Sequence, residues 1–258
     1  MKVQQLLMIP DPEQPERSLN IAQKYSCGFE YNDFYSPSFL EEKEQVDKRI
    51  EQYLAYKSPR THTMHGAFYD VTVFSDDPRM VRVSDERVVQ SLEIARRLGV
   101  RAVIFHTNFI PNFHSESYCQ NWMDRNEIYW AKKLEEYPDV DIYMENMFDM
   151  SCELLAQLAQ RLCGYSNFGV CFDYAHAHAF GDSLQMEHWV KTLAPFVKHI
   201  HINDNDLYED LHMALGEGDI DWKQFKIYYE TYFQKASVLV EMKDLDAAEK
   251  SLEYLLRL

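Results

Sequence analysis

The stretch DIYMENMFDMSCELLAQLAQRLCGYSNFGVCFDYA, residues 141–175, contains the repeating unit from which the fold can be inferred. Its two ends, 141–148 and 168–175, are short apolar and aromatic runs typical of buried strands. Between them, leucines recur at the three-to-four spacing of an amphipathic helix, and Gly164 follows that pattern as a residue after a helix end commonly does. A strand, a helix and a second strand in this order predict two parallel neighbours in one sheet.

The same alternation of strand and helix continues through the whole chain of 258 residues. Further helical patterns occupy 84–98 and 245–257. The expected strands are 2–9, 26–31, 61–68, 101–108, 141–148, 168–175, 197–204 and 237–244. Eight such units without a linker are typical of an α/β fold of the (β/α)8 TIM barrel class, so residues 1–258 are interpreted as one domain. The alternative is an open doubly wound sheet, which usually has fewer strands and a glycine-rich phosphate turn.

Composition limits the partners and the location of the protein. Apolar residues make up 46% of the chain and charged residues 26%, and no run resembles a membrane-spanning helix or a secretory signal. Twenty-six basic against 42 acidic residues give a net charge of −16, which repels phosphate backbones and makes nucleic acid an unfavourable partner. Five cysteines without a CxxC pair predict reduced thiols in a cytoplasmic protein that does not bind membranes.

Seven of the expected strands end in a histidine or a carboxylate. These residues are Glu30, His65, His106, Glu145, Asp173, His201 and Glu241. The carboxyl ends of parallel barrel strands meet at one mouth, so these side chains are expected to converge there. Imidazole nitrogens and carboxylate oxygens bind divalent ions such as zinc and manganese, and burying several carboxylates together without a cation is unfavourable. The alternative interpretation is a mouth that is polar without binding a metal.

Two long connections, 69–83 and 205–221, are expected at the same end of the barrel, where functional loops lie. The second contains Asp210 and His212, alternate residues that point the same way in an extended loop. They can close on one ion together with His176, for which His178 is the alternative. His199, two residues before His201, is expected beneath the mouth as a buried partner.

Seven short motifs carry a resemblance to a known family. They are HGAF at 65–68, IFHTN at 104–108, YMEN at 143–146, FDYAH at 172–176, HIND at 201–204, DLHMALGEGDI at 210–220 and VEMK at 240–243. In order and spacing, over roughly residues 26–244, they resemble the xylose-isomerase-like TIM barrels. That superfamily contains sugar and sugar-phosphate isomerases and epimerases, and AP endonucleases of the endonuclease IV type.

The resemblance implies one of two metal arrangements. In the ketose epimerases, one divalent ion is held by residues that match Glu145, Asp173, His201 and Glu241, and the two glutamates also move the substrate proton. In the endonuclease IV branch, three zinc ions are held by residues that match His65, His106 and Glu145, then Glu145, Asp173, His201 and Glu241, and finally His176, Asp210 and His212. Every one of these nine positions has the matching residue type, and the epimerases usually carry an arginine where this chain has His212. More than one bound divalent ion, zinc or manganese, is therefore expected.

The acidic charge favours a small-molecule carbohydrate substrate over DNA. The expected function is a metal-dependent isomerase or epimerase of a sugar or sugar phosphate, in which Glu145 and Glu241 move the proton beside a metal-polarised carbonyl. Substrate contacts are expected from Glu30, Phe68, Asn108 and Lys243. A homo-oligomer is compatible with this interpretation.

Two other functions stay open from the sequence. In a multinuclear zinc phosphodiesterase or AP endonuclease, Glu145 would bridge two ions and Glu241 would serve only as a ligand. In a sugar-binding barrel, the same residues would hold a metal and a ligand without turnover.

Overall fold

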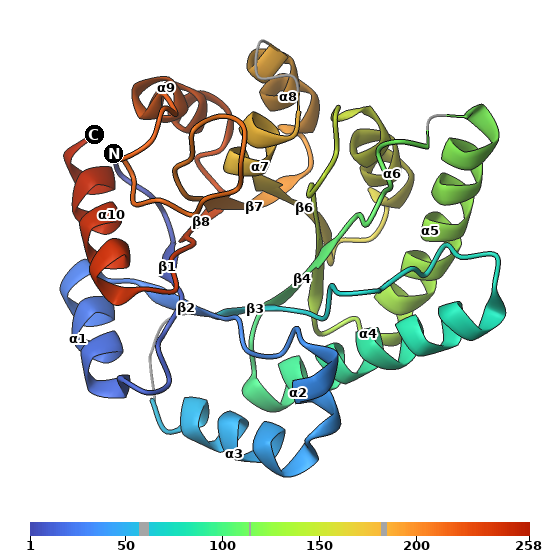
Figure 1. The fold of residues 1–258 in the computed structure, drawn as a ribbon, viewed down its shortest axis with the longest axis horizontal. Helices are drawn as coiled ribbons and strands as arrows, with labels where there is room; N and C mark the ends of the chain where they lie inside the picture. The colour runs from blue at the N-terminus through green and yellow to red at the C-terminus, as the bar shows by residue number, and fades with distance from the viewer. Residues whose placement is uncertain (57–61, 114, 182–184) are drawn as a thin grey trace.

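The computed structural model, which describes residues 1–56, 62–113, 115–181 and 185–258, contains a closed barrel of eight parallel strands (Figure 1). The strands are β1 (Leu6–Met8), β2 (Gly28–Tyr31), β3 (Thr63–His65), β4 (Ala102–His106), β5 (Asp141–Glu145), β6 (Phe168–Asp173), β7 (Val197–Ile202) and β8 (Ser237–Val240). Each strand pairs with the next along the chain, and β8 pairs with β1. The TIM barrel class is confirmed, and each strand is shorter than predicted; Thr61, where the third was expected to begin, lies outside the described residues.

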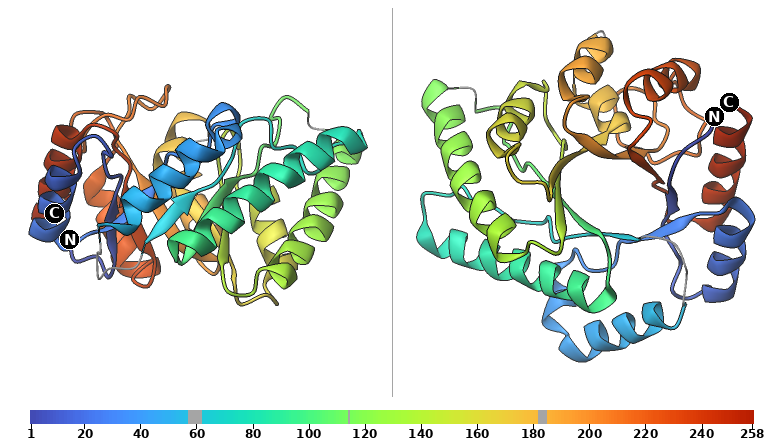
Figure 2. Two further views of the ribbon diagram at one scale, coloured as in Figure 1. Left: turned by 90° about the horizontal axis from the view of Figure 1, so that it is seen from below. Right: turned by 180° about the vertical axis from the view of Figure 1, so that it is seen from behind.

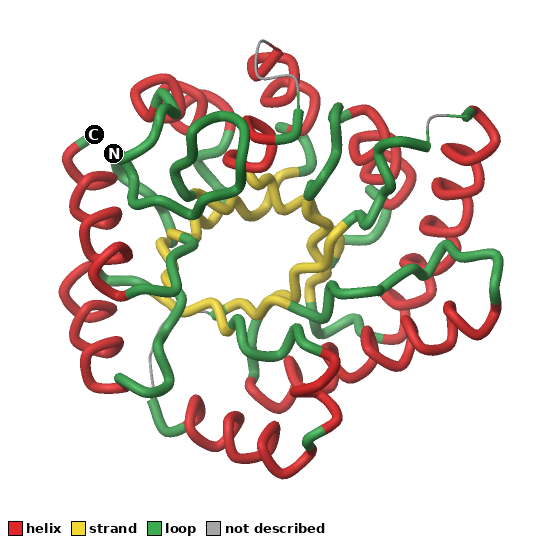
Figure 3. The backbone as a smooth tube through the Cα atoms, viewed as in Figure 1, coloured by secondary structure: helices red, strands yellow, loops and turns green. Residues whose placement is uncertain are grey.

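Helices form an outer ring around the strands (Figure 3). They are α1 (Pro15–Tyr25), α2 (Pro37–Glu41), α3 (Lys43–Leu54), α4 (Pro78–Leu98), α5 (Glu116–Glu136), α6 (Glu153–Leu162), α7 (Tyr174–Ala179), α8 (Met186–Leu193), α9 (Trp222–Tyr232) and α10 (Leu245–Arg257). Helix α4 begins six residues before the pattern at 84–98 because Asp77 caps it, accepting from the Arg79 amide, and Pro78 suits a first helical turn. Throughout the described ranges, each helix is too short or too polar to span a bilayer.

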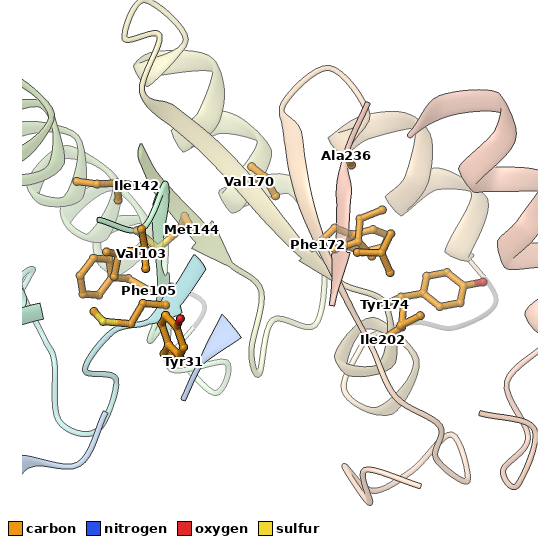
Figure 4. Packing of buried hydrophobic residues seen from close by; sticks show 14 of the residues in the cluster. Tyr31, Val103, Phe105, Ile142, Met144, Val170, Phe172, Tyr174, Ile202 and Ala236 are labelled. Carbon is orange, nitrogen blue, oxygen red and sulfur yellow. The ribbon is translucent and has the colours of Figure 1, made fainter. Parts of the chain in front are cut away.

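Alternation along the strands separates an apolar layer from the barrel interior. Val103, Phe105, Ile142, Met144 and Phe172 belong to the main core packed against the helices, as Figure 4 shows. Their neighbours Ile104, Tyr143 and Cys171 form a separate cluster inside the barrel. Because side chains alternate with a period of two, the interior set continues upward into His106, Glu145 and Asp173. The strand pattern therefore directs the polar strand ends into the barrel mouth.

The two chain ends lie side by side at the edge of the barrel (Figures 1 and 2). The Met1 ammonium donates a hydrogen bond of 3.0 Å to the carbonyl of Leu255 in α10. Helices α1 and α10 also exchange ion pairs, including Lys24 with Glu249 at 2.7 Å. The first and last units of the barrel are thereby held together, which supports the β1–β8 closure.

Asp204 organises the long connection between β7 and α9. Its buried carboxylate accepts hydrogen bonds from the amides of Gly216 and Ile220, at 2.7 and 3.2 Å, and from the Trp222 indole at 2.8 Å. Gly218 is required beside it, because an added Cβ would lie 2.5 Å from the Asp204 Oδ1 atom. The connection is therefore a fixed loop, and it carries Asp210 and His212 to the mouth.

We predict that Asp204→Ala lowers the free energy of unfolding by about 2–4 kcal/mol, because buried donors lose their acceptor. Urea denaturation of the full chain measures this change. The matched control is Asp206→Ala, which removes a carboxylate that caps only the exposed amides of Tyr208 and Glu209 and should change the free energy by less than about 1 kcal/mol. Equal losses in the two variants would contradict the role given to Asp204.

Candidate metal centre at the barrel mouth

The barrel mouth surrounds a cavity of about 510 Å³. Seven of the nine expected metal-binding residues line it: His65, His106, Glu145, His176, Asp210, His212 and Glu241. The other two, Asp173 and His201, are fully buried and form the floor beneath it, in contact with His176 and Glu145. The structure therefore brings the whole set together.

Glu145 lies at the centre of this set, 1% exposed, and is surrounded by histidines. Its Oε2 atom lies 3.5 Å from Nε2 of His65 and 3.5 Å from Nε2 of His106. Its Oε1 atom lies 3.5 Å from Nδ1 of His176 and 3.5 Å from Nδ1 of His201. These separations exceed those of good hydrogen bonds. Each carboxylate oxygen thus faces a separate pair of imidazoles.

Further potential ligands lie on two sides of Glu145. On one side is Glu241, whose Oε2 atom lies 3.6 Å from His201 Nδ1. On the other side is the β7–α9 loop, where the Asp210 Oδ2 atom lies 3.3 Å from His176 Nε2 and 3.1 Å from His212 Nε2. Potential ligand atoms of His176, Asp210 and His212 all lie within 4.8 Å of one another, as do those of His65, His106 and Glu145.

Hydrogen bonds fix which nitrogen of each ring faces the mouth. The Nδ1 atoms of His65, His176 and His212 lie 3.0–3.1 Å from the backbone carbonyls of Gly66, Asn146 and Glu241. A carbonyl can only accept, so Nδ1 carries the proton and donates it in these three rings. In each of them Nε2 is left to face the cavity. Such anchoring of the second nitrogen is typical of histidines that bind metals.

The donor set fits divalent cations. Buried atoms without a hydrogen-bond partner among the described residues concentrate here: Glu145 Oε2, Asp173 Oδ2, His176 Nε2, His201 Nδ1, Asp210 Oδ1 and Glu241 Oε2. Unpartnered buried polar atoms are rare in folded proteins, and so many at one place indicate a missing common partner. Carboxylates and neutral imidazoles together are the ligands that zinc and manganese accept.

The local charges shift several pKa values. Burial opposes the charging of His176, but Asp173, Asp210 and Glu145 outweigh it and raise the pKa of this ring to about 10. Burial likewise opposes the charging of His212, but Asp210 and Glu241 raise its pKa to about 9. Burial raises the pKa of the Asp173 carboxyl to about 7. Without a cation, the carboxylates therefore hold protons on the rings that would bind one.

We predict that metal binding to the EDTA-treated protein at pH 7.5 releases protons, because both rings must become neutral. The pKa values of His176 and His212 lie above the ordinary 6.5. The charge of these two rings therefore stabilises the metal-free fold fully below about pH 6.5, and this stabilisation is lost as the pH rises through about 9 to 10. The apparent zinc affinity should accordingly increase with pH. Calorimetric titration with zinc in buffers of different ionisation enthalpy measures the protons released, and a heat independent of the buffer would contradict the prediction.

Three of the four expected substrate-contacting residues line the cavity. Phe68 stacks on His106, with ring centres 4.7 Å apart. The Asn108 amide donates to the carbonyls of Phe68 and Val71, at 3.2 and 2.8 Å, so it also fixes the loop after β3. Lys243 Nζ lies 5.4 Å from the centre of the Tyr35 ring. These three side chains therefore border the cavity.

Part of the cavity wall consists of aromatic residues that were not predicted from the sequence. Tyr35 stacks on Phe68 at 5.0 Å, and Tyr69 and Phe148 also line the cavity. Tyr35 follows β2 by four residues, which places it in a loop at the mouth. This position in the sequence could have predicted that Tyr35 lies beside the cavity. His178, the alternative to His176, packs edge-on against Tyr174 at 4.7 Å, and burial lowers its pKa to about 4. It is absent from the described residues that line the cavity.

Glu30 differs from its expected place at the substrate. It is fully buried below the mouth, where it accepts from Thr63 at 2.7 Å and lies 3.0 Å from His199 Nε2. Its Oε1 atom lies 3.2 Å from Nε2 of His201. The expectation of a direct substrate contact is corrected, because the interior face of β2 directs this side chain beneath His201. Its carboxylate instead lies beneath the ring, whose Nδ1 faces Glu145, and His199 occupies the buried position predicted for it.

We predict that Glu30→Gln weakens zinc binding about 10- to 100-fold, because the carboxylate that orients His201 loses its charge. Competition with a chromophoric chelator measures the affinity. Asp149→Asn is the control, since this buried carboxylate accepts instead from Thr107 and the Met147 amide. A Glu30→Gln protein that binds zinc as the unmodified chain does would remove Glu30 from the centre.

Comparison with known proteins now identifies the family. A family model described as xylose isomerase-like TIM barrel matches residues 22–258. The chain belongs to this family. The resemblance inferred from the motifs is thus confirmed, and members of the xylose isomerase-like family are enzymes, including epimerases and endonuclease IV.

Relatives from both branches are similar to the chain. A probable endonuclease 4 of Campylobacter concisus is 26% identical over 208 residues, which cover 71% of this chain and 72% of that protein. The TTHB071 protein from Thermus thermophilus, in a structure soaked with ZnCl2, has a TM-score of 0.75 at 24% identity, covering 100% of this chain and 97% of its own. A D-tagatose 3-epimerase-like protein has a TM-score of 0.73 at 21% identity, covering 97% and 96%. At these identities the structural likeness concerns the fold.

Proposed function

We propose that the chain is a divalent-metal-dependent isomerase or epimerase of a sugar or sugar phosphate. The observation that carries this proposal is the convergence of two glutamates. Glu145 from β5 and Glu241 after β8 both line the cavity, and both lie within 3.6 Å of the same His201 nitrogen. Two carboxylates from different sides of a barrel mouth suit a reaction that removes a proton and returns it elsewhere.

The remaining cavity wall supports a small polyhydroxylated substrate. Tyr35, Phe68 and Tyr69 form an aromatic wall, which can cover the apolar face of a sugar ring. Among the described lining residues, Lys243 is the single lysine or arginine, and it suits one phosphate group at most. The net charge of −16 also disfavours a polyanionic substrate.

The proposed roles follow from these positions. Glu145, Asp173, His201 and Glu241 would hold a divalent ion, which would supply Lewis acidity at a substrate carbonyl. Glu145 and Glu241 take the neighbouring proton and return it, either on the opposite face or at the adjacent carbon. Asn108 keeps Phe68 in place beside the substrate, and Lys243 neutralises charge at the cavity entrance.

We predict that Glu145→Gln and Glu241→Gln each reduce turnover by about 10²- to 10⁴-fold without loss of the fold, because each removes a proton-transfer group. The measurement is conversion of a panel of ketoses, aldoses and their phosphates by the metal-loaded protein, with circular dichroism as the check on folding. Glu209→Gln, an exposed change on the β7–α9 loop, is the control. Near-normal activity in either glutamate variant would refute the acid–base assignment.

One observation favours a second candidate, a multinuclear metal phosphodiesterase. The Oε2 atom of Glu145 faces Nε2 of His65 and His106, and its Oε1 atom faces Nδ1 of His201, as the two oxygens of a carboxylate that bridges two ions would. In that enzyme Glu145 and Glu241 would be ligands rather than proton-transfer groups. Elemental analysis measures the ratio of metal to chain in protein purified without chelator. The same measurement on His65→Ala and His212→Ala shows how many of the ligand groups hold an ion. One ion per chain, unchanged in both variants, would assign these histidines to substrate and support the epimerase.

We predict weak binding to duplex DNA at physiological salt, because the acidic chain repels the phosphate backbone. Fluorescence anisotropy with a duplex that contains an abasic site, titrated at two salt concentrations, measures it. An intact duplex of the same length is the control. Tight, salt-sensitive binding with cleavage at the abasic site would overturn the sugar-enzyme proposal in favour of the endonuclease.

A further inference from the structure

A second hollow lies at the opposite end of the barrel, among the amino ends of the strands. It has a volume of about 620 Å³. Ser26 and Gly28 border it at the start of β2, Thr63 at the start of β3, and Ser237 at the start of β8. The mouth described above lies at the carboxyl ends, so the two hollows are separate.

The charge of this hollow is opposite to that of the mouth. Arg101, Lys198 and Lys235 line it, and the described lining residues include no aspartate or glutamate. Arg101 pairs with Asp141 at 3.1 Å, but neither lysine forms an ion pair with a carboxylate of the described residues. The chain carries 42 acidic and 26 basic residues, so two lysines without an acidic partner in one hollow are unexpected from composition.

Lys198 is built into the wall of the hollow. Its aliphatic stem crosses Gly169 on β6, where an added Cβ would lie 2.7 Å from the lysine Cδ. Its Nζ donates to the Ser166 carbonyl at 2.6 Å and lies 6.0 Å from the centre of the Tyr143 ring. Burial and the neighbouring Arg101 lower the pKa of this ammonium group, and the carboxylate of Asp141, which pairs with Arg101, raises it in part.

We propose that the hollow at the amino ends of the strands binds a small oxyanion, namely phosphate, sulfate or the phosphate group of a small metabolite. Lysine and arginine donors form charge-assisted hydrogen bonds with such groups. The bound anion would balance the charge of Lys198 and Lys235, neither of which makes a direct ion pair among the described residues. This site is independent of the sugar chemistry proposed for the mouth.

Titration calorimetry of the protein as purified, at low ionic strength, tests the site with sodium sulfate and with glycerol 2-phosphate. The test variant is Lys198→Met with Lys235→Gln, because methionine keeps an apolar stem over Gly169. We expect saturable binding to the unmodified chain and binding weaker by about tenfold or more in the variant. Binding of sulfate alone would assign the site to free inorganic anions, and binding of both probes would extend it to phosphate esters.

Two controls separate the site from other sources of anion binding. Lys48→Gln with Lys223→Gln changes the net charge equally at two exposed positions and should leave the affinity within about twofold. Lys243→Gln removes the lysine at the mouth and should also leave it unchanged. Loss of binding in Lys243→Gln with retention in the Lys198 and Lys235 variant would place the anion at the mouth and overturn the proposal, as would the absence of saturable binding. If the double variant does not fold, Lys235→Gln alone replaces it, because this side chain is exposed. An unchanged anion affinity in Lys235→Gln would also contradict the proposed site.

Discussion

The buried carboxylate of Glu145 sets the charge balance of the whole mouth. It is 1% exposed and has four imidazoles around it, so its charge must be balanced within the protein. A buried carboxylate can keep its charge only with strong partners or a cation. Either protons on the histidines or divalent ions between them can provide that balance. The pKa of His176 is raised to about 10, and those of His65 and His201 are raised as well, with Glu145 among the causes each time, so protons provide the balance when no metal is bound.

Contacts on the side away from the cavity determine how these imidazoles are oriented. Backbone carbonyls fix His65, His176 and His212, and the buried Glu30 carboxylate lies 3.2 Å from Nε2 of His201. Asp204 acts on two further ligands indirectly. Its hydrogen bonds fix the loop that carries Asp210 and His212. Glu30 and Asp204 therefore influence the mouth through the residues that they contact. Their removal should lower metal affinity or the stability of the fold.

The two ends of the barrel differ in charge although the chain as a whole is strongly acidic. Carboxylates and histidines gather at the carboxyl ends of the strands, and unpaired lysines border the hollow at the amino ends. The carboxyl-end cavity offers ligands for cations, and the substrate proposed for it is neutral or carries one phosphate group. The amino-end hollow suits an anion. This separation follows from the parallel strands, which place all residues of one register at the same end.

The barrel and most members of the metal set could be predicted from local residue patterns. Strand and helix periodicity indicated eight units. The polar residues that end seven of the strands identified His106, Glu145, Asp173 and their neighbours as a group, because parallel strands share one carboxyl edge. Which atoms face the cavity became clear only from the folded chain. Glu30 has the same kind of position in its strand as Glu145, yet it lies beneath His201, and Tyr35 joins the wall from a loop without periodicity. These outcomes depend on strand stagger around the barrel and on loop packing, which are distances between segments far apart in the chain and are not encoded in local residue patterns.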